Sequence, residues 1–426
     1  MDDNTTYTNT SSPWTTVGRM ATDFRRSAFF QSFKGDRVLW QIIILLSAIS
    51  LLAVFSATSS LADLNGKTAF EYLRRQFIFI AFSILLVYVA HITPYYLYRN
   101  FAKLILVFSF ALLVFTLLVG AEFNEASRRI ELFGLVTFHP SELAKFAIIL
   151  YIAKVLEEHS KDHTLDTFQK YFWRIIVPVA ALCVLLIRMG STSVALLLGF
   201  TVFIVLIVAR IRSSYLWKTL AIALALLGVI VLLSYTTPMF TRVKKMVNNR
   251  VLVFFAPEDS ERAKEAFTFQ PDNAKIAVAS GGFLGKGPGN STQRHILPNA
   301  YDDFIFAIIV EEYGLWGCSF VLLLYLWMFY RVVVIVRSCR KIFYSVVILG
   351  IMLQIVFQAF LHMGVSVGLL PVTGQTLPLV SHGGSSLITT GFALGIVLSI
   401  SREAEEQEKR EKGVYIEEKE EKNKKG

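Results

Sequence analysis

Two adjacent carboxylates, Asp302 and Asp303, lie where a polar, glycine-rich segment passes into a long apolar run. A carboxylate in that position can act as a general base on a hydroxyl group, or it can hold a divalent cation such as Mg²⁺ or Mn²⁺. The preceding segment carries Lys286, Arg294 and His295, and its Lys and Arg side chains suit an anionic group such as a diphosphate. This combination indicates an enzyme that acts on a charged head group attached to a lipid.

The same carboxylates have a simpler structural explanation. An Asp side chain at the start of a helix caps free backbone N–H groups, and either Asp302 or Asp303 can serve as that N-cap. If the segment binds an anionic substrate instead, other polar residues of the loops can contribute. These further candidates for substrate binding are Lys275, Asn290 and Ser291 in the same long loop and Arg128 in an earlier one.

The elements that must position these residues are membrane helices. The chain has 426 residues, of which 54% are hydrophobic, and its mean hydropathy is +0.54. About ten apolar runs are long enough to cross a bilayer. Backbone polar groups in lipid must be paired internally, so each run is expected to be helical. The sequence predicts an all-α polytopic membrane protein whose spans lie near 38–60, 76–93, 103–120, 141–157, 173–188, 191–209, 216–235, 304–330, 342–370 and 386–400.

Lys and Arg are concentrated in the segments that flank alternate ends of these runs, and this bias predicts that both termini are cytoplasmic. Residues 237–303 then form a large extracytoplasmic loop between the seventh and eighth helices. We expect a flexible N-terminal tail (1–37), a transmembrane domain (38–400) and a charged C-terminal tail (401–426). The net charge of +10 suits anionic membrane lipid and needs no nucleic acid to explain it.

Ionisable residues inside spans are costly, so each is a candidate functional residue. Glu142 and Lys145 are three residues apart and share a helix face. They can form an internal ion pair, or they can line a polar cavity. Glu311 and Glu312 lie inside the eighth run, and at least one of them must point inward, for structural pairing or for catalysis.

A polar stripe is expected on the ninth run, where Gln354, Gln358 and His362 are spaced four apart. Such a stripe faces a neighbouring helix or a cavity, and hydrogen bonding between helices is its simplest explanation. No paired Cys and His spacing of the kind that binds zinc accompanies His362.

Several long motifs follow one another along the chain. They are ASRR at 126–129, HPSELAK at 139–145, GGFLGKGPGNS at 281–291 followed by Leu297-Pro298, DFIF at 303–306, EEYG at 311–314 and GLLPVTGQTLPLVSHGGSS at 368–386. In content and order they resemble the signature motifs of the SEDS family (shape, elongation, division and sporulation), which includes the FtsW and RodA types. Ser381, in the last motif, is expected to be a structural or cavity residue.

The resemblance implies a ten-helix glycosyltransferase that polymerises lipid II, the undecaprenyl-diphosphate-linked disaccharide-pentapeptide, on the outer face of the cytoplasmic membrane. It also implies a class B penicillin-binding protein transpeptidase and other division proteins as partners. The family's essential Asp matches Asp303. Extending a β-1,4 glycan from an α-linked diphosphate inverts the anomeric carbon, so one general base suffices, while basic residues stabilise the leaving diphosphate. Whether Asp303 is that base or a metal ligand stays open.

Some positions depart from the family pattern. His139 and Arg129 replace a Gln and a Trp, Asp302 stands where Thr is frequent, and the sixth span opens on RMGST (188–192) without the usual acid. The Ser/Thr-rich N-terminal tail and the PVTGQTLP sequence resemble the FtsW type, which acts in division, more than the RodA type, which acts in elongation.

Two other functions compete with polymerisation. The ten spans and their intramembrane polar residues also suit a transporter, either a lipid II flippase or a solute carrier. A non-enzymatic scaffold that recruits division proteins through its tails is the third hypothesis. The concentration of motifs at one end of the predicted bundle favours the polymerase, because a translocation path needs polar groups through the whole depth of the membrane.

Overall fold

The computed structural model describes residues 35–64, 68–119, 130–132, 136–189, 191–237, 244, 247–252, 254, 269–297 and 300–425. Three sequence expectations therefore lie outside the described residues. They are the N-terminal tail up to residue 34, the ASRR motif with Arg128 and Arg129, and Pro298.

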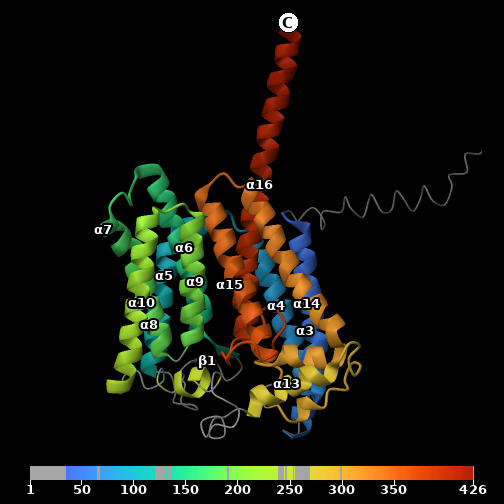
Figure 1. Ribbon diagram of the computed structural model, residues 1–426. Helices are drawn as coiled ribbons and strands as arrows, with labels where there is room; N and C mark the ends of the chain where they lie inside the picture. Colours follow the sequence, from blue (N-terminus) through green and yellow to red (C-terminus); the bar gives the residue numbers. More distant parts are fainter. Residues whose placement is uncertain are drawn as a thin grey trace, which may run out of the picture.

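The body of the protein is a bundle of upright helices (Figure 1). Eight helical stretches among the described residues are long and apolar enough to cross a membrane. The charged helix α6 and the shorter apolar helix α9 lie among them and bring the number to ten. In chain order they are α3 (Arg37–Leu64), α4 (Ala69–Ile92), α5 (Tyr95–Val119), α6 (Pro140–Asp162), the continuous α7 (Phe168–Tyr171), η1 (Phe172–Ile176) and α8 (Val177–Arg188), α9 (Thr192–Val208), α10 (Ser213–Thr236), α14 (Ile305–Ser338), α15 (Ile342–Ser366) and α16 (Gly384–Lys425).

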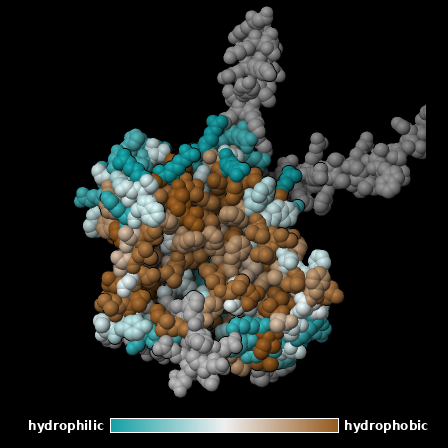
Figure 2. Space-filling model, in the orientation of Figure 1, coloured by the Kyte–Doolittle hydropathy of each residue, from teal (hydrophilic) through white to brown (hydrophobic). Residues whose placement is uncertain are grey.

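This arrangement confirms the predicted all-helical fold with about ten spans. Many large apolar side chains are exposed on the outside of the bundle, and on the face seen in Figure 2 they form a hydrophobic band across its middle with hydrophilic residues towards both ends. A helix that is apolar on its outward face is suited to lipid. The chain is a multi-pass membrane protein.

The core of the bundle lies around α15 and α16, whose apolar windows are each 83% buried, whereas the window of α10 is only 6% buried. Close packing of α16 on α4 depends on small residues. A Cβ atom on Gly391 would overlap Ser83, and one on Gly395 would overlap Ala90 and the backbone of Val87. These glycines let the two helices approach as small residues do in other membrane bundles.

One end of the bundle carries most of the irregular structure, and we call it the loop end. It comprises the strands β1 (Ile130–Leu132) and β2 (Val136–Phe138), helix α13 (Phe269–Gly281), the 3-10 turn η4 (Gln293–His295) and residues 367–383 (Figure 1). β1 and β2 pair antiparallel, a short element that the sequence had not indicated. A π-helical turn, η3 (Val247–Leu252), belongs to the loop between α10 and α13.

The C-terminal segment is helical from the bundle outward. α16 runs through Lys425 as one helix and projects beyond the bundle at the end opposite to the loop end (Figure 1). The residues that enter α3 lie at this same end, because a Cβ atom on Gly35 would lie 3.0 Å from the carbonyl oxygen of Leu398. The expected tail from residue 401 thus begins inside a helix.

Candidate active site

Asp302 and Asp303 lie in the turn that leads into α14 at the loop end, and both are partly exposed. The N-cap residue of α14 is Phe304, with φ of −130° and a side chain that is buried. Neither Asp therefore occupies the N-cap position that the sequence left open for them. The turn presents two adjacent carboxylates on the edge of a hydrophobic bundle.

The block at residues 368–386 holds this turn in place. The Ser381 hydroxyl donates a 2.7 Å hydrogen bond to the carbonyl oxygen of Asp302 and accepts one of 2.8 Å from the backbone N–H of Leu377. The backbone N–H of His382 donates to the carbonyl oxygen of Tyr301 at 3.0 Å. A Cβ atom on Gly383 would lie 3.9 Å from Oδ1 of Asp302, so this glycine borders the carboxylate.

A buried polar network runs from α6 to the same block. Lys145 Nζ lies 2.7 Å from Glu142 Oε2 and donates a 2.6 Å hydrogen bond to Gln358 Oε1. Gln358 Nε2 in turn donates to the carbonyl oxygen of Thr376 at 2.9 Å, and the Thr376 hydroxyl lies 3.0 Å from that of Ser386. A buried ammonium is costly unless it is paired, so Lys145 needs these partners. The network thereby fixes the position of the ion pair relative to the 368–386 block.

The other members of the α15 stripe also bind neighbouring elements. Gln354 Oε1 accepts a 3.0 Å hydrogen bond from Thr201 on α9, and His362 Nδ1 lies 2.7 Å from the carbonyl oxygen of Gln375. Both side chains are fully or almost fully buried. The stripe therefore faces protein on α9 and on the block, in line with hydrogen bonding between elements.

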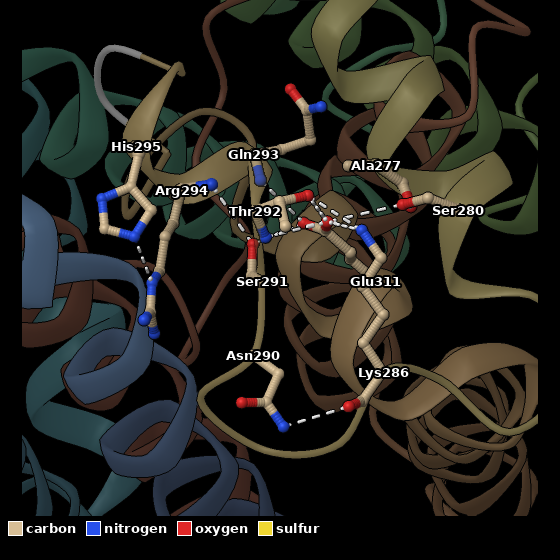
Figure 3. Close-up of polar contacts among 10 residues, drawn as sticks. All are labelled: Ala277, Ser280, Lys286, Asn290, Ser291, Thr292, Gln293, Arg294, His295 and Glu311. Atoms are coloured by element: carbon tan, nitrogen blue, oxygen red, sulfur yellow. Dashed lines mark hydrogen bonds and ion pairs between the residues drawn. The ribbon is translucent and has the colours of Figure 1, made fainter.

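A second polar cluster forms around Glu311, which is fully buried (Figure 3). Its Oε1 lies 2.5 Å from Lys286 Nζ and accepts hydrogen bonds from the Thr292 backbone N–H at 3.0 Å and from its hydroxyl at 2.8 Å. Its Oε2 accepts from the Ser291 hydroxyl and from the Gln293 N–H at 3.3 Å. One carboxylate of α14 thus organises the loop that precedes it.

The glycines of this region make the close approach feasible. At Gly314 the backbone of α14 leaves the helical conformation, with φ of 62° and ψ of −155°. The Leu315 N–H bonds to Gly282 and Phe283 instead of to the helix, and the carbonyl oxygens of Glu311 and Glu312 accept from Lys286 and Gly287 at 3.0 and 2.9 Å. The loop therefore satisfies the groups that the broken helix leaves open.

Several candidate substrate residues are engaged in this cluster. Lys286 and Ser291 bind Glu311, and Asn290 Nδ2 donates to the carbonyl oxygen of Lys286 at 3.1 Å (Figure 3). The structure brings these residues together with Glu311, not with Asp303. Their part in substrate binding stays a prediction.

Two other basic candidates lie closer to the surface. Lys275 on α13 pairs with Asp272 at 3.2 Å, and both side chains are about half exposed. Its aliphatic part lies over Gly368 at the start of the block. Arg294 contacts α3, because its Nη1 lies 3.4 Å from the Ser56 hydroxyl, which also donates to Glu312 Oε1.

Some residues of the site had not been singled out from the sequence. Thr376 and Ser386 extend the Lys145 network, and Gln76 of α4, fully buried, binds the side chain of His382. A signal for Gln76 was present, since an amide at the start of the apolar run of α4 needs a partner if it is buried. His139 also contacts the block, with Nδ1 2.8 Å from the Ser385 hydroxyl.

A divalent cation is compatible with this site only if substrate phosphates and water share its coordination with the protein. No group of three or more His, Cys, Asp or Glu side chains that could hold a metal occurs in the part of the chain that the structure describes. Mg²⁺, however, is commonly bound by one or two carboxylates together with substrate phosphates and water. Asp302 and Asp303 fit that kind of shared coordination.

A model of the cell cycle protein family of FtsW, RodA and SpoVE matches residues 36–406. Stage V sporulation protein E of Bacillus subtilis (strain 168) is 30% identical over 369 residues, which cover 86% of this chain and 97% of that protein. A probable peptidoglycan glycosyltransferase FtsW of Geobacter metallireducens is 32% identical over 373 residues, covering 86% and 94% respectively.

Two solved structures agree with these sequence matches. One is a chain from a study of the structural coordination of polymerization and crosslinking by a peptidoglycan synthase complex. It superposes with a TM-score of 0.66 at 27% identity, covering 87% of this chain and 98% of that one. The rod shape determining protein RodA of Thermus thermophilus superposes with a TM-score of 0.61 at 24% identity, covering 87% and 97%, and shares the fold.

Proposed function

The chain belongs to the cell cycle protein family of FtsW, RodA and SpoVE, and on that premise we propose that it polymerises lipid II into the glycan strands of the division septum. It is a peptidoglycan glycosyltransferase. The observation that carries the proposal is the turn with Asp302 and Asp303, which the 368–386 block fastens at the loop end. A lipid-linked substrate reaches such a site with its isoprenoid chain still in the bilayer.

In the proposed reaction, Asp303 accepts the proton of the acceptor sugar hydroxyl as that oxygen attacks the anomeric carbon of the donor. The bond from that carbon to the diphosphate breaks, and the configuration inverts. A positioned general base contributes typically about 10²–10⁴-fold to the rate. Arg294 and Lys275 are proposed to stabilise the leaving diphosphate, because positive charge opposes the charge that develops there.

A bound divalent cation would supply further charge stabilisation for the diphosphate. Asp302 and Asp303 would hold it together with the substrate. Removing divalent cations with EDTA, followed by adding back Mg²⁺ or Mn²⁺, separates the two roles of Asp303. Full activity after chelation excludes a role of Asp303 as cation ligand, whereas a strict requirement for the cation supports that role.

The sidedness and partner follow from the same proposal. The loop end is extracytoplasmic and both termini are cytoplasmic, in keeping with the shared end of α3 and α16. A class B penicillin-binding protein transpeptidase acts beside it. The similarity to a chain of a peptidoglycan synthase complex supports such a partner.

The decisive experiment is polymerisation of lipid II by the purified protein with its transpeptidase, comparing wild type with Asp303→Asn. Asp166→Asn is the matched control, because Asp166 is exposed and lies between α6 and α7, away from the loop end. Polymer from wild type and control but not from Asp303→Asn supports the proposal. Translocation of lipid II in sealed vesicles without any polymer would favour a flippase instead.

A further inference from the structure

The side chain of His382 is held by a chain of hydrogen bonds between elements far apart in the sequence. Ser50 of α3 donates to the carbonyl oxygen of Val380 at 2.7 Å, and Gln76 Nε2 of α4 lies 2.7 Å from the Ser50 hydroxyl. Gln76 Oε1 lies 2.7 Å from Nδ1 of His382. Ser50 and Gln76 are fully buried, so this chain is shielded from water.

These bonds determine which ring nitrogen of His382 carries the proton. A backbone carbonyl only accepts, so the Ser50 hydroxyl donates its single proton to Val380 and must accept from Gln76. The Gln76 NH₂ group is thereby directed to Ser50 and its carbonyl oxygen to His382. Because that oxygen only accepts, Nδ1 carries the proton, and Nε2 presents a lone pair.

The surroundings keep this imidazole neutral. Burial, with a smaller contribution from the positive charge of Arg75, lowers the pKa of His382 to about 4. Arg75 directly precedes Gln76 on α4, and it aligns with Tyr72 and Phe79, which are three and four residues away along the helix. The rings of Tyr72 and Phe79 lie 6.4 Å from that of His382.

His382 is also adjacent to the proposed catalytic turn. The centre of its ring lies 5.6 Å from that of Tyr301 with an interplanar angle of 74°, and its backbone N–H binds the Tyr301 carbonyl. The preceding residue, Ser381, binds the backbone of Asp302. His382 is partly exposed, so its acceptor atom lies near the surface next to the turn that carries the two carboxylates.

We propose that His382 is a positioning residue for the substrate, whose Nε2 accepts a hydrogen bond from a hydroxyl or amide N–H of the lipid-linked disaccharide and holds the sugar beside Asp303. The rings of Tyr72, Phe79 and Tyr301 form the apolar wall of this subsite, and Gln76 sets the orientation of the imidazole. The inference rests on the proposed polymerase function. A purely structural His382 would pack between these rings without contacting substrate.

Two substitutions at His382 distinguish these roles. Asn can keep the hydrogen bond to Gln76 but has no group at the position of Nε2, whereas the longer Gln side chain can place its carbonyl oxygen there. With lipid II as substrate, we expect His382→Asn to raise KM about tenfold, the effect of one lost hydrogen bond, with kcat little changed. His382→Gln should recover most of that loss.

His163→Asn is the matched control. His163 is exposed and lies between α6 and α7, and its φ of 49° is a conformation that Asn tolerates. The KM of the His163→Asn variant should therefore equal that of wild type. Thermal unfolding of each variant shows whether the fold is retained. If His382→Asn does not fold, two tests of the role of His382 remain. They are the comparison of His382→Gln with wild type and the Gln76→Glu variant described below.

A change at Gln76 tests the same inference through pH. In Gln76→Glu the carboxylate faces Nδ1–H and favours the imidazolium, which turns Nε2 into a donor. Activity relative to wild type at the same pH should then fall as pH drops through the raised pKa of His382 and recover above it. The other charged or titratable groups near the ring are Arg75, Tyr72, Tyr301 and Asp302, and all are unchanged in this variant.

The outcomes separate this inference from the proposed function. If wild type polymerises and Asp303→Asn does not, but His382→Asn has the KM of wild type, only the role of His382 is overturned. An equal loss in His382→Asn and His382→Gln, with the pH profile of wild type for Gln76→Glu, points to packing alone and overturns it too. If wild type forms no polymer, the function and this inference both fail.

Discussion

Lys286 and Glu311 form an ion pair of 2.5 Å that joins the extramembrane loop to the interior of α14. The lysine side chain is 28% exposed, whereas the glutamate is fully buried. The ion pair therefore lies between the surface and the interior of the protein, and only its lysine is accessible to water.

This difference predicts unequal effects of substitution. Lys286→Gln leaves the Glu311 carboxylate buried without its cation and should destabilise the protein by about 3 kcal/mol. Glu311→Gln should cost less, because the partly exposed Lys286 ammonium can turn to water and the glutamine amide oxygen can still accept from Ser291 and Thr292. Thermal unfolding of the purified variants measures both. The exposed pair of Asp272 and Lys275 provides the control, with an expected effect below about 1 kcal/mol.

The break in α14 gives a prediction for Gly314. An alanine there must adopt a positive φ and its Cβ would overlap the backbone of Phe283 and Gly285. Gly314→Ala should therefore destabilise the protein by more than about 1–2 kcal/mol, the cost of the backbone conformation alone. Gly199→Ala is the comparison, since no atom lies within 4 Å of its Cβ position in α9. Equal unfolding temperatures for the two variants would contradict the observed break.

Packing of α16 on α4 can be tested at Gly395. A leucine there cannot fit against Val87 and Ala90, so Gly395→Leu should separate the helices and lower the yield of folded protein. The matched variant Gly228→Leu, on the poorly covered helix α10, should be tolerated because its Cβ position is open. Size-exclusion profiles and unfolding temperatures in detergent report the difference.

The network from α6 to the 368–386 block predicts an effect on both stability and activity. Lys145→Met leaves Glu142 buried without its cation and should cost about 3–5 kcal/mol. The double variant Lys145→Met, Glu142→Gln removes the orphaned charge and should recover part of that stability. Polymerisation should stay reduced in the double variant, because Gln358 no longer has the partner that orients it towards Thr376. Recovery of full activity would show that the network does not position the block.

Much of the fold was predictable because a membrane leaves few choices. Apolar runs near 342–370 and 216–235 became α15 and α10, since lipid requires paired backbone groups. Contacts between residues close in the sequence were predictable as well. Glu142 and Lys145 pair as their spacing indicated.

Contacts set by tertiary structure could not be read in this way. The run through Glu311 and Gly314 predicts one continuous helix, and only the approach of the 281–287 loop explains why it breaks. The partnership of Gln76 with His382 joins residues 306 positions apart. No periodicity in the sequence encodes such a distance, and the β1–β2 pair was missed because strands of three residues have no pattern of their own.

The 42 residues of α16 form one helix that starts within the 368–386 block and ends far beyond the bundle. At 1.5 Å per residue such a helix is about 60 Å long, roughly twice the thickness of the hydrocarbon core. Its first turns contain Ser385 and Ser386, which touch His139 and Thr376 at the loop end. A protein that binds the last turns of α16 would hold the far end of this helix, and a tilt imposed there would displace these hydroxyls at the loop end.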